Sequence, residues 1–371
     1  MKSYKKIIDV CRFFGIEGDP VNYKIFTDGH INSTYLIEFK KDNETKKYLV
    51  QNINTTVFKD PEALMKNIID VTHFLRKKIR QVGGDPERET LRFRKTVNGN
   101  LCLHDGENCW RIYDFIDNSF TYDLIDNKEI FKSAGESFGR FQQLLSDYPI
   151  DTLYETIPDF HNTPKRLEAL TEAIEEDCAG RAENVRSEIE FALSRKSDAF
   201  VALDLVKKGE IPIRVTHNDT KLNNILFDRD TGRGICVIDL DTIMPGLSLY
   251  DFGDAIRFGA KTAFEDEADL SKVSVSLELF EAYTEGYLSS CAKALTKAEI
   301  DNLAFSAKLM TYECGVRFLT DYLNGDTYFR IDYPEHNLVR ARNQFKMVKE
   351  IEKVLPQMND IVHNLYKKLT K

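Results

Sequence analysis

The chain has 371 residues, of which 42% are hydrophobic and 30% charged, a composition typical of a globular protein with two or three lobes. Its formal net charge is −9 and it has no long basic run, so we expect no nucleic-acid polymer as a partner. The seven cysteines form no C-x-x-C pair and no stretch of about 18 apolar residues is present, so we expect a cytoplasmic protein outside the membrane. The histidines show no ligand-like clustering with the cysteines, so we expect no structural zinc site.

The first third of the chain has the pattern of a helix followed by strands. Helical periodicity covers 4–14. Alternation then predicts three strands around 23–25, 35–39 and 48–52. A helix with proline in its first turn is expected from 59 to about 78, and further strands are expected near 90–96, 100–104 and 109–114.

The remainder of the chain, after Asp117, is mainly helical in pattern. Helices are expected near 127–146, 163–178, 182–195, 198–207, 273–289, 297–323 and 336–369. The exception is a short hairpin, with apolar strands at 225–227 and 235–238. These patterns predict an α+β chain in two lobes, with a hinge at 110–117, an N-terminal lobe over 1–113 and a C-terminal lobe over 114–371.

The most informative motif is HNDTKLNN at 217–224, which has the H-x-D-x-x-x-x-N spacing of a kinase catalytic loop. Asp219 would accept the proton of an attacking hydroxyl. Asn224 offers a neutral carbonyl oxygen to a hard cation. Lys221 would neutralise charge on the transferring phosphoryl group.

The second part of this pattern is Asp239, which follows the apolar strand of the hairpin. A carboxylate there can bind Mg²⁺ that bridges two phosphates of a nucleotide. Asp241 is either a second ligand or a structural anchor. The alternatives are ordinary: Asp219 as a loop or helix-capping carboxylate, Asn224 as a turn residue and Asp239 as a surface carboxylate. The octet, the hairpin and the strand that ends in aspartate together favour phosphoryl transfer.

Two further features are less specific. The turn at 28–32 contains Gly29, which would let the backbone approach a phosphate. Arg317 lies on an apolar helical stripe, so it must be paired or solvated in a cleft; a structural ion pair and a substrate contact are both open. The segment 253–262 resembles a P-loop, but its glycine spacing does not fit one.

Several segments carry a resemblance to a known family: TDGHINSTYLIEF, VFKDPEALMKNI, RIYDFID, THNDTKLNNILFD, VIDLDTIMPGLSLYDFGDAIRFG and RFLTDYLNGDTYF. In these segments the chain resembles the phosphotransferase family of aminoglycoside and choline kinases, and within it the N-acetylhexosamine 1-kinase branch. The resemblance implies a protein-kinase-like fold with ATP and Mg²⁺ as cofactors. It also implies phosphorylation of the anomeric hydroxyl of N-acetylglucosamine or N-acetylgalactosamine. The expected partners are the nucleotide and the sugar, and the chain is expected to be a monomer or a weak homo-oligomer.

The resemblance also implies roles for residues. It places the base at Asp219 and the metal ligands at Asn224 and Asp239. Sugar contacts are implied for His30, Phe258, Arg317 and Tyr328. Nucleotide contacts are expected at the 28–32 turn and the hinge, from Gly29, Asn32, Tyr113 and Phe115. Asp251 and Asp254 match a part of the family pattern that we interpret as structural.

One departure from the kinase pattern concerns the residue that binds the phosphates of the nucleotide. A V-A-I-K strand would carry a lysine in mid-strand, and the strand here reads KYLVQNIN. Gln51, Asn52 or Lys47 are possible substitutes, and Glu62 is considered as the glutamate that would pair with such a lysine. The alternatives for function are therefore a kinase of another small alcohol (choline, an amino alcohol, a nucleoside or an aminoglycoside) and a non-catalytic nucleotide sensor.

Overall fold

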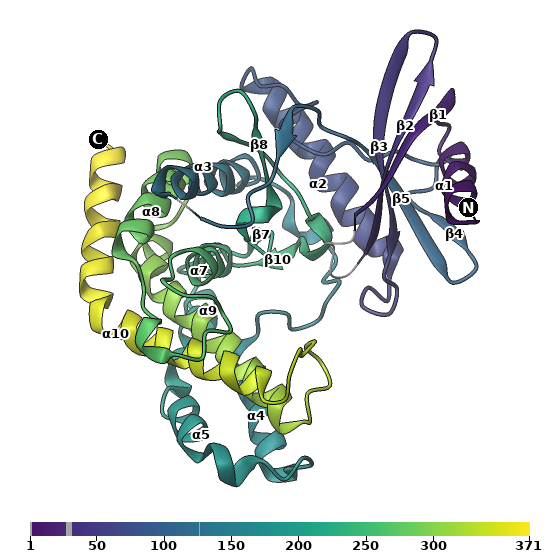
Figure 1. Ribbon diagram of the computed structural model, residues 1–371. Coiled ribbons are helices and arrows are strands. Elements are labelled where there is room, and N and C mark those ends of the chain that lie inside the picture. Colours follow the sequence, from purple (N-terminus) through teal and green to yellow (C-terminus); the bar gives the residue numbers. More distant parts are fainter. Residues whose placement is uncertain (1, 27–31, 126) are drawn as a thin grey trace. The chain divides into compact units, whose positions relative to one another are not determined.

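The computed structural model describes residues 2–26, 32–125 and 127–371, and the chain divides into two compact units (Figure 1). Unit 1 consists of Met1–Phe120, Asp147–Pro158 and Leu226–Pro245. Unit 2 consists of Thr121–Ser146, Asp159–Ile225 and Gly246–Lys371. Unit 1 contains the strand-rich first third of the chain, and unit 2 contains most of the helices.

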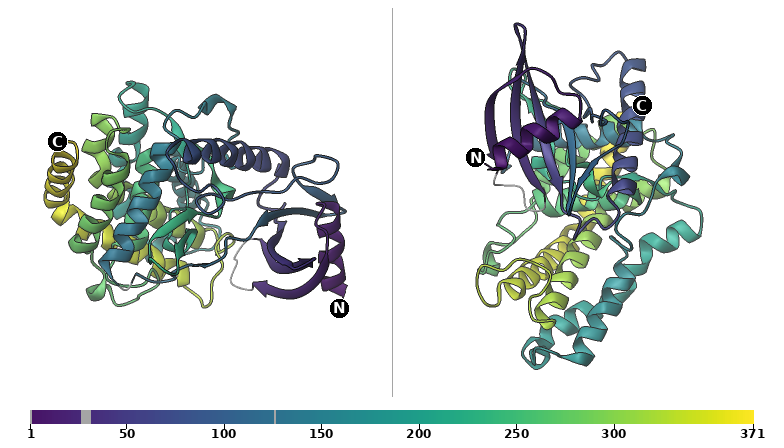
Figure 2. Two further views of the ribbon diagram at one scale, coloured as in Figure 1. Left: turned by 90° about the horizontal axis from the view of Figure 1, so that it is seen from above. Right: turned by 90° about the vertical axis from the view of Figure 1, so that its right-hand side faces the viewer.

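Unit 1 is built on a five-stranded antiparallel sheet in the order β1-β2-β3-β5-β4. The strands are β1 (Asp19–Phe26), β2 (Ser33–Lys41), β3 (Glu44–Ile53), β4 (Leu103–Asp105) and β5 (Asn108–Asp114). Figure 2 shows helix α1 (Lys2–Phe13) crossing one face of this sheet. Ile7, Val10 and Cys11 of α1 pack there on buried residues of the strands, including Ile37 and Val50. The three strands and the first helix that the sequence predicts are confirmed.

The prediction of a strand over 90–96 is wrong. Phe93 makes only an isolated bridge to Tyr113, and the backbone pairs briefly through Arg94 N–Ile112 O (2.8 Å). The segment stays short because it competes with β4 for the side of β5 that faces away from β3. β4 pairs with the first residues of β5, Asn108–Trp110 in register, so the 92–94 segment and β4 share one edge and both remain short.

Helix α2 (Pro61–Gln81) begins as its sequence predicts. Asp60 accepts a hydrogen bond from Ala63 N at 2.9 Å, and Pro61 occupies the first helical position. The later part of unit 1 contains β6 (Ser119–Phe120), η1 (Ile150–Thr152), β8 (Ile225–Asp228), β9 (Gly234–Val237), η5 (Leu240–Thr242) and most of β10 (Met244–Gly246). The predicted hairpin is confirmed as β8 and β9, in a sheet of the order β6-β8-β9.

The helices of unit 2 are α3 (Lys128–Leu144), α4 (Thr163–Glu176), α5 (Arg186–Leu193), α6 (Val201–Lys207), α7 (Ser248–Gly259), α8 (Leu277–Cys291), α9 (Lys297–Leu323) and α10 (His336–Leu369). The single turns are η2 (Ala182–Val185), η3 (Lys196–Phe200), η4 (Leu222–Asn224) and η6 (Leu270–Lys272), and β7 spans Arg214–Thr216. Helix α7 falls where the sequence shows a P-loop-like segment and no helix is expected. No helix among the described residues is long and apolar enough to cross a membrane.

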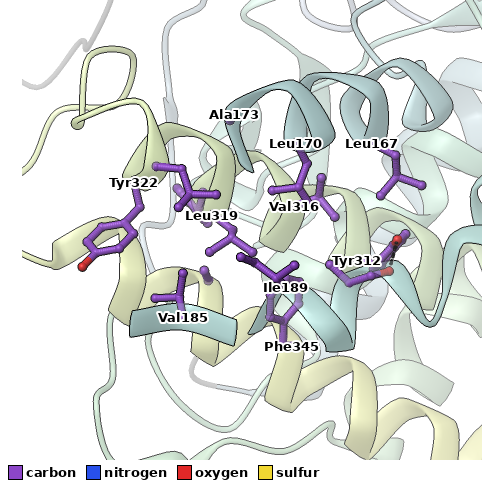
Figure 3. Packing of buried hydrophobic residues seen from close by; sticks show 14 of the residues in the cluster. Leu167, Leu170, Ala173, Val185, Ile189, Tyr312, Val316, Leu319, Tyr322 and Phe345 are labelled. Carbon is purple, nitrogen blue, oxygen red and sulfur yellow. Dashed lines mark hydrogen bonds between the residues drawn. The ribbon is translucent and has the colours of Figure 1, made fainter. Parts of the chain in front are cut away.

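Two packing relationships organise unit 2. Figure 3 shows side chains of α4, α5, α9 and α10 pointing toward one another, with Leu170, Val316 and Phe345 in a buried apolar cluster. Helices α3 and α8 approach closely because Gly135 and Gly286 lie at the contact. A Cβ at Gly286 would lie 2.0 Å from the carbonyl oxygen of Lys132, so only glycine fits there.

Candidate active site

The 217–224 loop follows β7 in unit 2 and is held by a buried carboxylate of α7. Asp251 accepts hydrogen bonds from His217 N (2.9 Å), Asn218 N (2.7 Å) and Gln142 Nε2 (3.0 Å). Asn218 has a φ of 64°, in the left-handed region. Because both oxygens of Asp251 bind backbone donors of the loop, the carboxylate fixes this unusual turn.

A second carboxylate of α7 supports the next residue. Asp254 accepts a hydrogen bond from Thr220 N at 3.2 Å and binds Arg257 Nε at 2.9 Å. Burial raises the pKa of Asp254, but the charges of Arg257, His161 and Lys221 together outweigh this, so the pKa lies below its ordinary value. Asp251 and Asp254 thus have the structural role that the sequence indicates.

Three predicted site residues come together at the tip of this loop. Lys221 Nζ lies 2.8 Å from Asp219 Oδ1. Asn224 Nδ2 donates to the carbonyl oxygen of Asp219 at 2.8 Å and to its Oδ2 at 3.1 Å. The Asp219 side chain keeps 25% of its exposure, and the N-cap of η4 is Lys221, so within the described part of the chain Asp219 is not a helix cap.

The loop tip has the chemistry of a proton acceptor beside a fixed cation. Burial lowers the pKa of Lys221, but the charge of Asp219 and its hydrogen bond outweigh this, so the pKa lies above its ordinary value and the side chain is an ammonium. Asn224 uses its amide nitrogen on Asp219, which leaves the amide oxygen as the donor that a hard cation prefers.

In unit 1, Asp239 follows β9 and lies at the start of η5 with a φ of 58°. Its side chain is exposed, and an exposed carboxylate is the kind of ligand that Mg²⁺ takes. Two residues later Asp241 is 4% exposed. Asp241 Oδ1 forms an ion pair with Arg111, and Asp241 Oδ2 accepts from Asn32 Nδ2 at 2.6 Å. Since protein groups hold both oxygens, Asp241 is an anchor of η5, which decides between the two roles that the sequence leaves open.

Arg111 on β5 is a buried cation next to Asp241 that the sequence patterns do not single out. It is 3% exposed and its Nε donates to Gln51 Oε1 at 2.9 Å. Gln51 and Arg111 stand opposite each other in the pairing of β3 with β5. The charges of Asp241 and Asp239 both act on Arg111, and although burial lowers its pKa, these charges keep it above its ordinary value. Its signal in the sequence is a charged residue inside the apolar strand WRIYDF.

The substitutes considered for the mid-strand lysine have other partners inside unit 1. Gln51 binds Arg111, and Asn52 Nδ2 donates to Asn108 Oδ1 at 2.7 Å. Lys47 Nζ lies 2.6 Å from Asp117 Oδ1. Glu62 Oε1 lies 2.5 Å from His104 Nε2, so its partner is a histidine and not a strand lysine.

The residues expected to contact the nucleotide are only partly described. Gly29 and His30 lie outside the described residues. Asn32 binds Asp241 and accepts a hydrogen bond from Asn54 N at 2.9 Å. In the 110–117 segment that the sequence predicts as a hinge, the ring of Tyr113 is tilted against that of Phe93, with the centroids 5.0 Å apart. Phe115 N donates to Lys47 O at 3.1 Å, so the backbone here extends the pairing of β5 with β3 by one residue.

The residues expected to contact the sugar fall into two separate pockets of unit 2. Arg317 and Tyr328 line one pocket of about 310 Å³, together with Arg166. Phe258 lines another, of about 740 Å³, with Lys261 and Arg340. The structure therefore brings Arg317 and Tyr328 together and places Phe258 apart from them.

The surroundings of Arg317 differ from those of a structural ion pair. Its guanidinium lies over the rings of Phe160 (5.8 Å) and Phe329 (5.5 Å). Among the described residues no carboxylate lies within ion-pair distance of it. The neighbouring Arg166 has a buried Nε without a hydrogen-bond partner, and burial lowers its pKa. Two guanidinium groups thus line one pocket with donors left for a ligand.

The comparison that decides the family is the match of residues 22–288 to the model of the phosphotransferase enzyme family. The chain belongs to this family. The prediction of family membership is confirmed, and the N-acetylhexosamine 1-kinase branch stays a prediction.

Solved structures of similar fold give the same architecture. An aminoglycoside phosphotransferase from Alicyclobacillus acidocaldarius is 12% identical, with 96% of each chain covered and a TM-score of 0.59. Spectinomycin phosphotransferase in complex with ADP and spectinomycin is 17% identical, with 95% of this chain and 98% of that chain covered and a TM-score of 0.56. Choline kinase from Cryptosporidium parvum is 15% identical, with 98% and 99% covered and a TM-score of 0.55. At these identities the likeness shows the fold alone.

The phosphotransferase therefore has the predicted α+β, two-lobed, protein-kinase-like fold, with a small antiparallel-sheet part and a larger helical part. Its membership of an enzyme family for phosphoryl transfer confirms the reaction class that the 217–224 motif predicts.

One cluster in the phosphotransferase was not expected from the sequence. The structure brings the ligand atoms of Cys102, His104 and Cys109 within 4.8 Å of one another. The hairpin of β4 and β5 makes this cluster, because it joins residues whose spacing in the sequence fits no common zinc motif.

Proposed function

We propose that this phosphotransferase transfers the γ-phosphoryl group of ATP to the anomeric hydroxyl of an N-acetylhexosamine, N-acetylglucosamine or N-acetylgalactosamine, and releases the sugar 1-phosphate and ADP. The observation that carries the proposal is the geometry at Asp219. The carboxylate is partly exposed, is bound by Lys221 and Asn224, and belongs to a loop that Asp251 fixes.

The reaction needs a group that accepts one proton and a group that balances charge. As the acceptor oxygen forms its bond to the γ-phosphorus, the bond from that phosphorus to the bridging oxygen of ADP breaks. Asp219 takes the proton of the acceptor hydroxyl. The ammonium of Lys221, 2.8 Å from Asp219, stabilises the negative charge on the transferring group.

Mg²⁺ suits the oxygen donors in the two halves of the motif. Asn224 offers its amide oxygen and Asp239 an exposed carboxylate, which is the ligand chemistry of a hard cation. When bound, Mg²⁺ would neutralise charge on the phosphates of the nucleotide. Arg111 keeps the segment with Asp239 in place through its ion pair with Asp241.

ATP as the donor is supported by the spectinomycin phosphotransferase structure, which holds ADP. For this chain we assign nucleotide contacts to Gly29, Asn32 and the hinge residues Tyr113 and Phe115. Tyr113 and Phe115 lie in and directly after β5 and bring aromatic rings to the 110–117 segment, which suits contact with a flat purine ring.

The acceptor side is supported by the pocket of Arg317 and Tyr328. A pocket of about 310 Å³ with guanidinium donors suits a small hydroxylated molecule. His30 and Phe258 are the further sugar contacts that the resemblance implies. Since Phe258 lines a different pocket from Arg317, a direct sugar contact is better supported for Arg317.

A kinase of another small alcohol is the second candidate, because the similar structures include a choline kinase and aminoglycoside phosphotransferases. A substrate panel separates the candidates. Purified protein is incubated with ATP, Mg²⁺ and one acceptor at a time (the two N-acetylhexosamines, choline, ethanolamine, a nucleoside and an aminoglycoside), and products are followed by ³¹P NMR. The proposal predicts an acid-labile sugar phosphate with an anomeric coupling. An acid-stable product, or turnover only with choline or an aminoglycoside, contradicts it.

A further inference from the structure

A second constellation of reactive side chains lies in unit 1, in the hairpin of β4 and β5. In its register His104 stands opposite Cys109, and Cys102 precedes His104 by two residues. Directly paired side chains point to the same side, so His104 and Cys109 lie together, and Cys102, which directly precedes β4, brings its Sγ to 3.7 Å from His104 Nε2. The β4–β5 hairpin therefore brings two thiols and one imidazole close to one another.

The distances within this cluster centre on one atom, His104 Nε2. It lies 3.7 Å from Cys102 Sγ, 4.0 Å from Cys109 Sγ and 2.5 Å from Glu62 Oε1. A neutral imidazole has at most one proton on this nitrogen, so the nitrogen cannot donate to Glu62 and accept a proton from a thiol at the same time. The ligand atoms of the two thiols and the imidazole lie within 4.8 Å of one another, and the carboxylate of Glu62 contacts the imidazole of His104.

We propose that Cys102, His104, Cys109 and Glu62 form a structural Zn²⁺ site. For tetrahedral zinc with Zn–S of about 2.3 Å and Zn–N of about 2.0–2.1 Å, sulfur and nitrogen ligands are separated by about 3.6 Å. The two S···N separations of 3.7 and 4.0 Å fit this geometry with small shifts. Glu62 lies next to this three-residue group through its contact with His104, and its carboxylate would move toward the thiols to become the fourth ligand.

The burial of the ligands also fits a metal site, because the two thiols are buried and the other two ligands are exposed to solvent. Cys102 is 4% exposed and Cys109 is fully buried. The side chains of His104 and Glu62 keep 51% and 61% of their exposure, and His104 lines an open groove between α1 and β4. Zinc can enter past the two exposed ligands and reach the thiols below them.

A neighbouring side chain already orients the ligands. Asn52 of β3 accepts a hydrogen bond from Cys109 N at 3.2 Å and donates to Asn108 Oδ1 at 2.7 Å. Such contacts fix the backbone that carries a metal ligand. Two sulfur ligands with one imidazole select zinc over magnesium and calcium, which prefer oxygen ligands only.

The bound ion would join two elements of unit 1 that are about 40 residues apart. Glu62 lies in the first turn of α2, and the other three ligands lie on the β4–β5 hairpin. On binding, each thiol loses its proton to water as its Zn–S bond forms, and no electron is transferred. All four residues belong to unit 1 and none has a role in the proposed phosphoryl transfer, so the role of the ion would be to stabilise unit 1.

The test uses the full chain, isolated under reducing conditions and freed of metal with a chelator. Zinc is returned and the bound metal is measured by elemental analysis after gel filtration. We expect one equivalent per chain. A parallel titration with Co²⁺ is expected to give the visible bands of tetrahedral cobalt and a near-ultraviolet charge-transfer band from thiolate.

Matched variants assign the ligands. His104→Gln and Cys109→Ser are expected to weaken zinc binding by more than the 10–100-fold typical of groups that only support a ligand. His73→Gln, an exposed histidine on α2, and Cys178→Ser, an exposed cysteine in unit 2, are expected to bind as the wild type does. Because His104 is exposed, its variant folds even if the substitution of the buried Cys109 does not.

The proposal is overturned if the wild type retains no more zinc than His104→Gln does, or if bound Co²⁺ shows no thiolate charge transfer. It is also overturned if Cys102 and Cys109 are found as a disulfide in peptides of the freshly isolated protein, since oxidised sulfur atoms do not bind zinc. None of these readouts depends on phosphoryl transfer, so failure here leaves the proposed kinase activity untouched.

Discussion

Arg111 on β5 and Asp241 on η5 form a buried ion pair inside unit 1, 130 residues apart in the sequence. The side chains are 3% and 6% exposed. Asn32 and Gln51 complete the hydrogen bonds of the pair, so neither charge is left without a partner. The pair ties the segment that carries Asp239 to the five-stranded sheet.

Removal of one charge of this pair is expected to be costly. Asp241→Asn leaves the guanidinium of Arg111 buried without its ion-pair partner, so we expect a loss of about 3–5 kcal/mol in the free energy of unfolding. Urea unfolding followed by circular dichroism measures it. The matched control is Glu17→Gln, which removes the solvent-exposed ion pair with Lys41 and is expected to leave the free energy of unfolding nearly unchanged. Equal losses in the two variants would contradict the role of Asp241 as an anchor.

Arg317 is expected to act on the acceptor and not on the nucleotide. Its guanidinium has no carboxylate partner among the described residues and lines the small pocket with Tyr328. Loss of one charge-assisted hydrogen bond of about 1.5–3 kcal/mol corresponds to a fall of about 10–150-fold in kcat/KM for the acceptor. Steady-state kinetics of Arg317→Met measure it. Arg330→Met, at a side chain that is 89% exposed, is the control. A change confined to the KM for ATP would argue against acceptor binding.

Glu313 of α9 links the stability of unit 2 to pH. Its Oε1 lies 2.8 Å from His161 Nδ1, and its Oε2 accepts from Thr163 Oγ1 at 2.6 Å. Burial raises the pKa of Glu313, but the charge of His161 and its hydrogen bond outweigh this, so the pKa lies below the ordinary 4.5. For a carboxyl whose folded pKa is lowered, the stabilisation is complete above the unfolded pKa and is lost as pH falls through the folded pKa.

Glu313→Gln is therefore expected to be less stable than the wild type near neutral pH, by about 3 kcal/mol. The two proteins should approach each other in stability as pH falls from about 6 to about 3. Urea midpoints across this range measure the difference. Glu278→Gln, at an exposed carboxylate of α8, should run parallel to the wild type. A difference between Glu313→Gln and the wild type that stays constant with pH would contradict the assignment.

Local signals in the sequence predicted the long helices well. The ends of α9 agree with the expected 297–323 because its start is encoded nearby, in a capping box of Thr296 and Glu299. Helix α7 was missed because its stability comes from packing. A Cβ at Gly253 would lie 2.3 Å from the carbonyl oxygen of Ser306, so α7 packs tightly on α9 at a residue with low helix propensity.

The candidate active site also shows that local sequence signals do not predict contacts between distant elements. The loop residues Asp219, Lys221 and Asn224 are close in sequence, and spacing alone grouped them. The partner of Arg111 is set by strand register and by an element far along the chain, which periodicity does not encode. The cluster of Cys102, His104 and Cys109 depends on the register of a hairpin in the same way.

The most direct test of the proposed chemistry is Asp219→Asn, which keeps the shape of the side chain and removes the proton acceptor. We expect the turnover of ATP with an N-acetylhexosamine to fall by about 10²–10⁴-fold, while ATP binding measured by calorimetry is retained. Asp204→Asn, at an exposed carboxylate of α6, should keep full turnover. If Asp219→Asn turns over as fast as the wild type, Asp219 is not the base and the account of the active site is wrong.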